Sequence, residues 1–303
     1  MKKTFYSNGK LLITGEYLVL DGAKALALPT KYGQNLTVEN GDNKVIEWKS
    51  FDFDGTLWFE NTIPFLDIVN KHSSEKGTIL STLIEILHET YLLNPNFINQ
   101  SNGYLISTHL TFPKFWGLGT SSTLINNIAQ WNNINAFTLL QNSFGGSGYD
   151  IACAQNNIPL VYQLINNVPQ FETIHFQPKC IDTLYFVYLN KKQNSKSSIL
   201  DYNKSQKDLS STIPAINAIT DTISNNPNFD TLCSQFELHE EIISHILKSK
   251  PVKETLFPDF EGTIKSLGAW GGDFVLVVSK KNPTSYFEEK GYSTIVPYQE
   301  MIL

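Results

Sequence analysis

Apolar residues in the first 60 positions recur at the short spacing that is typical of β-strands. Residues 4–20 predict two short strands around a turn at Asn8-Gly9, and residues 25–28 predict a third extended segment. Residues 36–60 alternate between apolar and polar side chains, with turn residues at 52–55, so we expect antiparallel strands there. The pattern therefore predicts that a β-sheet forms the first part of the chain.

Beyond residue 60 the pattern alternates between helical and strand spacing. The expected helices lie at 77–93, 120–131, 137–140, 151–154, 204–225 and 228–249, and the expected strands at 103–111, 183–189 and 274–279. Asparagine and proline become frequent at 166–182, which predicts a crossing between domains. A chain of 303 residues is long enough for one large or two medium domains.

The stretch Pro113–Thr123 has the composition of a phosphate-binding loop. Gly117 and Gly119 let a ligand approach the backbone closely, since neither has a Cβ atom. Thr120, Ser121 and Ser122 fall where a helix is expected to start, and free N–H groups at a helix start favour an anion. Their hydroxyls can also bind a phosphate oxygen or Mg²⁺. A helix that merely begins after a glycine turn is the alternative.

The charge balance narrows the range of partners. The net charge is −6 with no basic run, which argues against nucleic acid or an anionic membrane as a partner. All 23 basic residues are lysine, so lysine, backbone N–H groups and hydroxyls must hold any phosphate or carboxylate. The three cysteines and six histidines show no metal-ligand spacing. With no apolar run long enough to span a membrane, we expect a cytoplasmic protein, monomeric or homodimeric.

The glycine loop does not match the two most familiar phosphate loops. Walker A requires a lysine after the second glycine, and the dinucleotide fingerprint requires a glycine where this chain has Ser122. The loop instead resembles Pro-x3-Gly-Leu-Gly-Ser-Ser-Ala-Ala of the GHMP kinases, the superfamily of galactokinase, homoserine, mevalonate and phosphomevalonate kinases. Residues 113, 117–119 and 121 match this motif, and Ser122 is a small residue where the motif has alanine.

Three further segments resemble GHMP motifs in the expected order. Gly9-Lys10, followed by Gly15-Glu16-Tyr17, is similar to the first motif, with Asn8 in place of proline. Ser147-Gly148-Tyr149-Asp150 fits the setting of the family's catalytic aspartate, and Gly148–Ala152 matches a subgroup named for that pentapeptide. Lys265–Asp273 is similar to the third motif, with Trp270 and Asp273 in place of glycines.

The resemblance implies an α+β, two-domain GHMP kinase fold. Residues 1–172 would form an ATP-binding domain like ribosomal protein S5 domain 2, and residues 173–303 a ferredoxin-like domain. It also implies ATP and Mg²⁺ as cofactors and a small-molecule hydroxyl as acceptor. Asp150 would be the catalytic base and Lys10 its helper. The implied ATP-binding residues are Pro113, Gly117, Leu118, Gly119, Thr120, Ser121 and Ser122, with Ser121 also on the metal. The implied substrate-binding residues are Glu16, Tyr17, Ser147, Gly148, Gly268, Gly271 and Gly272.

Each of these residues also has a purely structural interpretation. Lys10 fits a solvated strand edge, Asp150 fits the start of a helix, and residues 265–273 fit a glycine-rich turn. The segment 124–149 contains no aspartate or glutamate, although several family members place a metal-binding glutamate there. That gap, together with the bulky Trp270, keeps open a GHMP-fold protein that binds ATP or a metabolite without catalysis.

The choice of acceptor follows from two short segments. Gly15-Glu16-Tyr17 and Lys196-Ser197-Ser198, the latter in a polar loop, favour the mevalonate-pathway branch over sugar kinases. The absence of arginine disfavours an acceptor that already carries a phosphate, which favours mevalonate over phosphomevalonate. It also disfavours a decarboxylase of the same fold, which would use an arginine near the aspartate.

Overall fold

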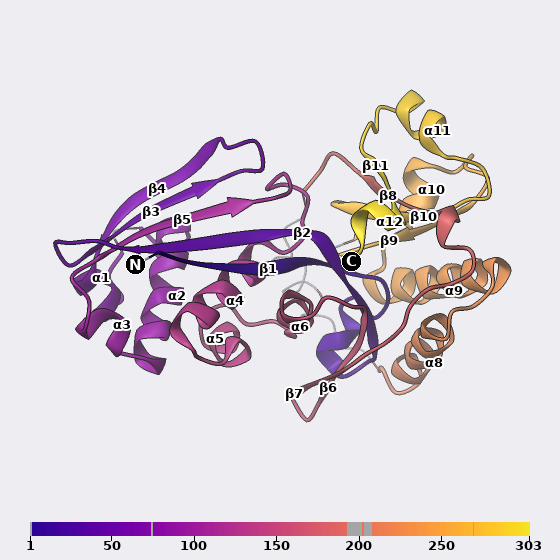
Figure 1. Cartoon of the computed structure of the whole chain (residues 1–303). Helices are drawn as coiled ribbons and strands as arrows, with labels where there is room; N and C mark the ends of the chain where they lie inside the picture. Colours follow the sequence, from indigo (N-terminus) through magenta and orange to yellow (C-terminus); the bar gives the residue numbers. More distant parts are fainter. Residues whose placement is uncertain (1, 74, 193–201, 203–207, 269) are drawn as a thin grey trace. The chain divides into compact units, whose positions relative to one another are not determined.

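The computed structural model describes residues 2–73, 75–192, 202, 208–268 and 270–303 (Figure 1). The chain divides into two compact units that interleave along the sequence. The first unit comprises Met1–Gly9, Tyr32–Lys114 and Leu118–Gln155, and the second comprises Lys10–Lys31, Phe115–Gly117 and Asn156–Leu303. The sequence predicts a boundary between two domains near residue 172, and this boundary stays a prediction.

The first unit is built on a mixed sheet. Strand β3 (Val45–Phe51) pairs with β4 (Leu57–Pro64) in antiparallel and with β5 (Tyr104–Leu110) in parallel orientation. Residues 34–40 of β2 (Ala25–Asn40) pair antiparallel with β5, and β1 (Lys2–Leu12) pairs with β2. The alternation of apolar and polar residues predicted these strands, because one face of the sheet is covered.

Helices cover one side of this sheet, where Figure 1 shows α1 to α5 together beneath β3, β4 and β5. The described helices of the first unit are α1 (Phe65–Val69), α2 (Ile79–Leu93), α3 (Asn96–Asn99), α4 (Thr120–Asn132), α5 (Ala136–Ser143) and α6 (Tyr149–Gln155). Trp48 of β3 and Leu87 of α2 belong to the apolar core between the two layers. The core therefore holds the helices against the sheet through apolar side chains at helical and strand spacing.

A buried polar seam fixes α4 against the strands. Asn127 of α4 is fully buried, donates from Nδ2 to the Gln34 carbonyl at 2.8 Å and accepts from the Ser7 hydroxyl at 2.8 Å. Thr123, one turn earlier, donates to the Gln34 side-chain oxygen at 2.8 Å. Since both anchors are on α4, the seam sets the position of the helix that follows the glycine loop.

The second unit contains a four-stranded antiparallel sheet. Its strand order is β11 (Ile295–Pro297), β8 (Leu184–Tyr188), β10 (Phe274–Val278) and β9 (Thr263–Ser266). Every residue of the central strand β10 is buried, which explains its unbroken apolar sequence. Val275 and Val277 pack with Phe257 in one apolar cluster.

Helices and a hairpin complete the second unit. The helices are α8 (Thr212–Ser224), α9 (Phe229–Leu247), α10 (Val252–Leu256), α11 (Thr284–Glu289) and α12 (Tyr298–Met301). Short 3₁₀ turns lie at Leu18–Asp21 and Ile181–Thr183. Strands β6 (Leu160–Ile165) and β7 (Val168–Thr173) form an antiparallel hairpin, and β6 also pairs with residues 25–27 of β2. Helices and strands in both units confirm the α+β class.

The expectation of two strands within residues 4–20 is wrong. One strand, β1, runs through Asn8-Gly9 to Leu12, and the apolar run that follows forms a 3₁₀ turn. Gly15 and Tyr17 have φ values of 81° and 61°, which take the backbone out of the extended conformation. Leu18 and Val19 of the run are buried in this turn without pairing as a strand.

The segment 166–182, expected to be a crossing, begins instead inside a hairpin. Asn166 and Asn167 join β6 to β7 with φ values of 52° and 60°, a left-handed pair that asparagine tolerates and that fits the twist of a two-residue hairpin turn. The helix expected from residue 204 begins at Thr212, and residues 203–207 lie outside the described part. In the described part of the chain, no helix is both long and apolar enough to cross a membrane.

The polar seam generates a stability prediction. Asn127→Ala removes the side-chain donor to the buried Gln34 carbonyl and the acceptor of the buried Ser7 hydroxyl, so we expect the first unit to lose about 2–4 kcal/mol of unfolding free energy in a urea titration. Asn225→Ala is the matched control, because the exposed Asn225 side chain also donates to a backbone carbonyl, that of Asp221, at 2.8 Å. Equal losses in both variants would contradict the role of the seam.

Candidate active site

Helix α4 begins without a side-chain cap. Its N-cap residue is Gly119, with φ of 98°, and this residue provides no side-chain cap. Among the described helices, α2, α5 and α9 are each capped by a side-chain oxygen, from Thr78, Asn135 and Asn228. Because the first N–H groups of a helix have no partner within it, the start of α4 presents donors to an external acceptor.

The hydroxyl residues of the first turn have different surroundings. Ser122 is buried, and its hydroxyl donates to the Gly119 carbonyl at 2.9 Å. Thr123 is also buried, and its hydroxyl bonds to the same carbonyl at 3.0 Å. Ser121 is exposed and Thr120 is half-buried. The exposed Ser121 hydroxyl is thus the one best placed to reach a ligand, while Ser122 and Thr123 stabilise the turn.

The loop before α4 is anchored at several backbone positions. In the first unit, the Lys114 N–H donates to Asp52 Oδ1 at 3.0 Å. Pro113 is half-buried and Leu118 is fully buried. In the second unit, the Tyr188 hydroxyl donates to the Phe115 carbonyl at 3.1 Å. Trp116 meets Phe274 edge-to-face at 5.4 Å. Each unit thus anchors the part of the loop that belongs to it.

Gly117 brings two charged side chains together within the second unit. Lys10 donates from Nζ to the Gly117 carbonyl at 3.1 Å. The carboxylate of Asp273 lies so close to Gly117 that a Cβ atom there would come within 2.5–2.7 Å of it. Burial raises the pKa of Tyr188, and the negative charge of Asp273 raises it further. The structure therefore joins the first motif, the glycine loop and the third motif at one residue.

The third motif forms the turn between β9 and β10, as Val275 pairs with Ser266. Gly268 and Gly271 have φ values of 63° and 83°, and Gly272 is buried. Trp270 and Asp273, the two departures from glycine, also have left-handed φ values, 52° and 55°. Trp270 is buried, and its indole N–H donates to the Lys250 carbonyl at 3.2 Å. Trp270 and Asp273 thus adopt the left-handed backbone conformation that glycine favours.

Asp150 lies in the first turn of α6, within the first unit. It is half-buried, and its Oδ1 accepts from the Ile151 N–H at 3.1 Å. Ser147 is buried, and Gly148 has φ of 90°. Left-handed glycines immediately before the helix turn the chain, so that Asp150 is presented on a short, constrained backbone.

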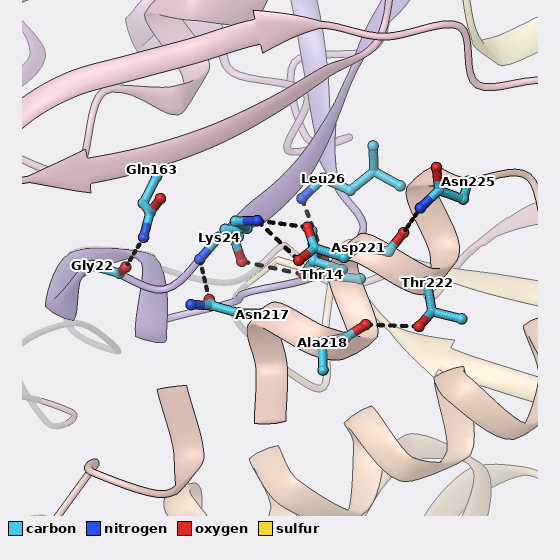
Figure 2. A network of polar contacts seen from close by, with 11 residues as sticks. Thr14, Gly22, Lys24, Leu26, Gln163, Asn217, Ala218, Asp221, Thr222 and Asn225 are labelled. Atoms are coloured by element: carbon cyan, nitrogen blue, oxygen red, sulfur yellow. Dashed lines mark hydrogen bonds and ion pairs between the residues drawn. The ribbon is translucent and has the colours of Figure 1, made fainter. Parts of the chain in front are cut away.

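The first motif is held against α8 and α9. Figure 2 shows Lys24 between two residues of α8: its N–H donates to Asn217 Oδ1 at 2.7 Å and its ammonium to Asp221 at 2.7 Å. Thr14 shares a hydrogen bond of 2.8 Å with Thr220. Tyr17 stacks on Tyr202 with ring centroids 5.3 Å apart. Gly15 must be glycine, because a Cβ atom would lie 2.6 Å from the Lys24 carbonyl.

Glu16 of this motif belongs to a buried cluster of charged and polar side chains, which we call the ion cluster. The Lys265 ammonium, fully buried, is 2.5 Å from Glu16 Oε1 and 3.3 Å from Glu240 Oε1. His239 is also fully buried; its Nε2 accepts from the Gly15 N–H at 3.0 Å and lies 3.3 Å from Glu16 Oε2. Ser266 donates to Glu240 Oε2 at 2.7 Å. One lysine thus compensates two carboxylates.

Burial dominates the titration of this cluster. It raises the pKa of Glu16 to about 7, although the Lys265 charge acts in the opposite direction. Burial likewise raises the pKa of Glu240. Burial and the Lys265 charge lower the pKa of His239 far below its ordinary value, so the imidazole is neutral. Since Nε2 accepts from Gly15, the ring proton is assigned to Nδ1.

The sequence interpretation missed the α9 part of the cluster. His239 and Glu240 fall on the same helical face as Leu232, Phe236 and Ile243, all of them buried. A charged residue on an apolar face was the available signal for a buried ion pair. The expected acceptor loop, Lys196–Ser198, lies outside the described residues. Within the described ranges, no three His, Cys, Asp or Glu side chains group as a metal site.

Comparison with solved structures shows the fold. Mevalonate kinase of Methanococcus jannaschii superposes with a TM-score of 0.71 at 16% identity, covering 96% of this chain and 95% of that one. Phosphomevalonate kinase of Streptococcus pneumoniae, in complex with phosphomevalonate and AMPPNP, has a TM-score of 0.69 at 14% identity, covering 96% and 97%. Galactokinase of Lactococcus lactis, complexed with galactose, has a TM-score of 0.67 at 10% identity, covering 95% and 88%.

No family model matches the chain, and no curated protein matches its sequence. The structural likeness covers nearly the whole chain and confirms the two-domain GHMP kinase fold that the motifs predicted.

The ion cluster predicts a characteristic pH dependence. A carboxyl whose pKa rises from 4.5 in the unfolded chain to about 7 in the fold stabilises the protein below pH 4.5, and this contribution is lost as the pH rises through 7. Relative to Glu16→Gln, the wild type should therefore lose on the order of 1–3 kcal/mol of unfolding free energy between pH 5 and 8. Urea titrations across this range measure the difference.

Glu47→Gln, at an exposed position of β3, is the control and should follow the wild type at every pH. Parallel pH profiles for Glu16→Gln and the wild type would show that Glu16 keeps an ordinary pKa.

Gly117 gives a second prediction that separates steric from conformational cost. Gly117→Ala should lose about 1–3 kcal/mol of stability, because φ of 71° strains alanine and its Cβ meets Asp273. Adding Asp273→Gly should recover the steric part. Gly145→Ala is the matched control: φ is 73° and nothing lies within 4 Å of its Cβ position. Equal losses at 117 and 145 in urea titrations would remove the steric claim.

Proposed function

We propose that this protein is an ATP-dependent kinase that phosphorylates a hydroxyl of a small metabolite. The observation that carries the proposal is the start of α4, where a glycine N-cap leaves the first N–H groups open to an anion. The GHMP kinase fold supports it, because structures of mevalonate kinase, phosphomevalonate kinase and galactokinase share this fold over nearly the whole chain. Both lines point to a polyphosphate as the ligand of the loop.

The residues of the loop fit ATP and Mg²⁺ chemically. Backbone N–H groups at Thr120, Ser121 and Ser122 suit phosphate oxygens, and Lys10 adds a positive charge at Gly117. The exposed Ser121 hydroxyl suits Mg²⁺, a hard cation that prefers oxygen ligands. Without arginine, these groups and not guanidinium forks would hold the phosphates. When bound, ATP supplies the phosphoryl group and Mg²⁺ neutralises its charge.

The protein's part in the reaction is to position groups and hold a proton. Asp150, on its constrained turn, would accept the proton of the acceptor hydroxyl. The Lys10 ammonium would favour the ionised form of that hydroxyl or of Asp150 by its charge. Glu16 is enclosed in the ion cluster, so its role would be to hold the first motif in place. Gly148, Gly268, Gly271 and Gly272 would let the acceptor approach the backbone.

For the acceptor we propose mevalonate or a related intermediate of isoprenoid biosynthesis, in the cytoplasm. Gly15-Glu16-Tyr17 supports this branch, as does the likeness to mevalonate and phosphomevalonate kinases. The absence of arginine favours mevalonate itself over its phosphorylated form.

A protein that binds ATP or a metabolite without catalysis is the second candidate. Two observations favour it: Trp270 fills a glycine position of the third motif with a buried indole, and residues 124–149 contain no carboxylate. The two candidates differ in turnover and agree in nucleotide binding.

The proposal predicts the following outcome for Asp150→Asn. Phosphoryl transfer from ATP with Mg²⁺, measured against mevalonate, phosphomevalonate, homoserine and simple sugars, should fall by about 10²–10⁴-fold for the preferred acceptor. ATP binding should persist. Asp230→Asn is the matched control, since Asp230 also lies in the first turn of a helix but is exposed on α9. ATP binding without transfer to any acceptor by the wild type would favour the non-catalytic candidate.

A further inference from the structure

His239 Nε2 faces two groups that make opposite demands on it. The Gly15 N–H donates to this nitrogen at 3.0 Å, and Glu16 Oε2 lies 3.3 Å from it. A neutral imidazole nitrogen carries either a lone pair or a proton, so it can accept from Gly15 or donate to an ionised Glu16, but not both. The two contacts are compatible when Glu16 Oε2 itself carries a proton.

Burial keeps bulk water from resolving this conflict. Glu16 and His239 are 1% and 0% exposed, respectively. Among the described residues, Glu16 Oε2 and His239 Nδ1 have no hydrogen-bond partner. An ionised Oε2 would therefore face the Nε2 lone pair across 3.3 Å in a poorly solvated place, where repulsion is strong. A proton on Oε2 replaces this repulsion with an attractive contact.

The charges of the ion cluster place the proton on Glu16 in preference to Glu240. Lys265 supplies one positive charge to two carboxylates, and His239 is neutral, so one further proton balances the ion cluster. Both oxygens of Glu240 face a donor: Oε1 lies 3.3 Å from the Lys265 ammonium, and Oε2 accepts from the Ser266 hydroxyl at 2.7 Å. Among the described residues, Glu16 has one such donor, Lys265 at Oε1, which leaves Oε2 for the proton.

We infer that Glu16 and His239 hold one exchangeable proton and form a pH-sensitive switch on the first motif. In the protonated state, the Glu16 Oε2–H group faces His239 Nε2, this nitrogen accepts from Gly15, and the ring proton is on Nδ1. When one proton is lost to solvent, the remaining proton of the pair lies on Nε2 and is donated to the Glu16 carboxylate. The Gly15 N–H then has no acceptor on His239. Only O–H and N–H bonds change in this step.

The groups around Glu16 keep both states accessible near neutral pH. Among the described residues, the charged and titratable groups that face it are His239 and Glu240 from α9 and Lys265 from β9. Burial, opposed by the Lys265 charge, raises the pKa of Glu16 to about 7, and the Glu240 charge adds to the rise. Burial and Lys265 lower the pKa of His239 far below its ordinary value, so the ring is neutral in both states. The protonated state is therefore present below about pH 7 and is lost above it.

The switch reaches a turn of the first motif through the backbone of Gly15. The Gly15 carbonyl accepts from the Val19 N–H at 2.9 Å, in the 3₁₀ turn Leu18–Asp21. The N-cap residue of this turn is Tyr17. Gly15 therefore connects the ion cluster to this turn. The switch operates within the second unit and does not require a bound nucleotide.

NMR of the ¹⁵N-labelled histidine rings tests the switch in the wild-type protein. The two neutral tautomers differ in which ring nitrogen carries the proton, and the ring nitrogen shifts distinguish them. The His239 signal, identified by its loss in His239→Gln, should report the Nδ1–H tautomer at about pH 5 and the Nε2–H tautomer at about pH 9. One tautomer throughout, or a charged ring at about pH 5, would overturn the inference.

Hydrogen exchange of the Gly15 amide measures the other side of the switch. The Leu26 N–H is the matched reference, since it donates to the Thr14 hydroxyl at 2.9 Å in the same unit and reports any general loss of stability. Protection of Gly15 relative to Leu26 should fall by about 10-fold between about pH 5 and about pH 9, because one hydrogen bond is lost. A constant ratio would contradict the switch.

Two variants assign the proton. Glu16→Gln places an amide N–H where the Oε2–H group lies, so the Nδ1–H tautomer and the protection of Gly15 should persist at about pH 9. In Glu240→Gln the tautomer change should remain, with its midpoint at lower pH, because the Glu240 charge contributes to the raised pKa of Glu16. A tautomer change that survives Glu16→Gln, or that disappears in Glu240→Gln, would place the proton elsewhere and overturn the inference.

Discussion

The second unit depends on one buried ammonium group. Lys265 has no exposed surface, and its charge is compensated by Glu16 and Glu240. Removing one partner of such a buried pair typically costs about 3–5 kcal/mol, because a charge is left uncompensated. Lys265 lies in strand β9 and is the first residue of the third motif, Glu16 belongs to the first motif, and Glu240 lies on α9. The ion cluster therefore sets the relative position of two motifs separated by 249 residues.

Backbone conformation in the loops is imposed by neighbours as much as by residue type. Gly117 has to be glycine, because the Asp273 carboxylate occupies the space of its Cβ. Trp270 and Asp273 show the converse, since each adopts a left-handed conformation without being glycine. Strand β10 begins directly after this turn and is buried throughout, which fixes one end of the loop. A substitution in such a motif can thus change its chemistry while its backbone stays in place.

A chain without arginine has to handle anions with other groups. Here the candidates are the open N–H groups of α4, the Lys10 ammonium at Gly117 and the hydroxyl of Ser121. Backbone N–H groups are fixed donors that need no side-chain ordering, so a helix start can replace guanidinium forks at little entropic cost. The buried hydrogen bonds of Asn127 keep these donors in position, because they hold helix α4 against the strands.

The sequence alone determined the features that neighbouring residues encode. Helical spacing predicted α2, an unbroken apolar run predicted β10, and glycine with hydroxyl residues predicted the loop before α4. The tertiary structure decided what the run Leu18–Leu20 becomes, because burial between left-handed residues outweighs its strand propensity. It also decided the partners of Lys265 and the contact of Asp273 with Gly117. These depend on side chains that are far apart along the chain, and only packing of the folded unit brings them together.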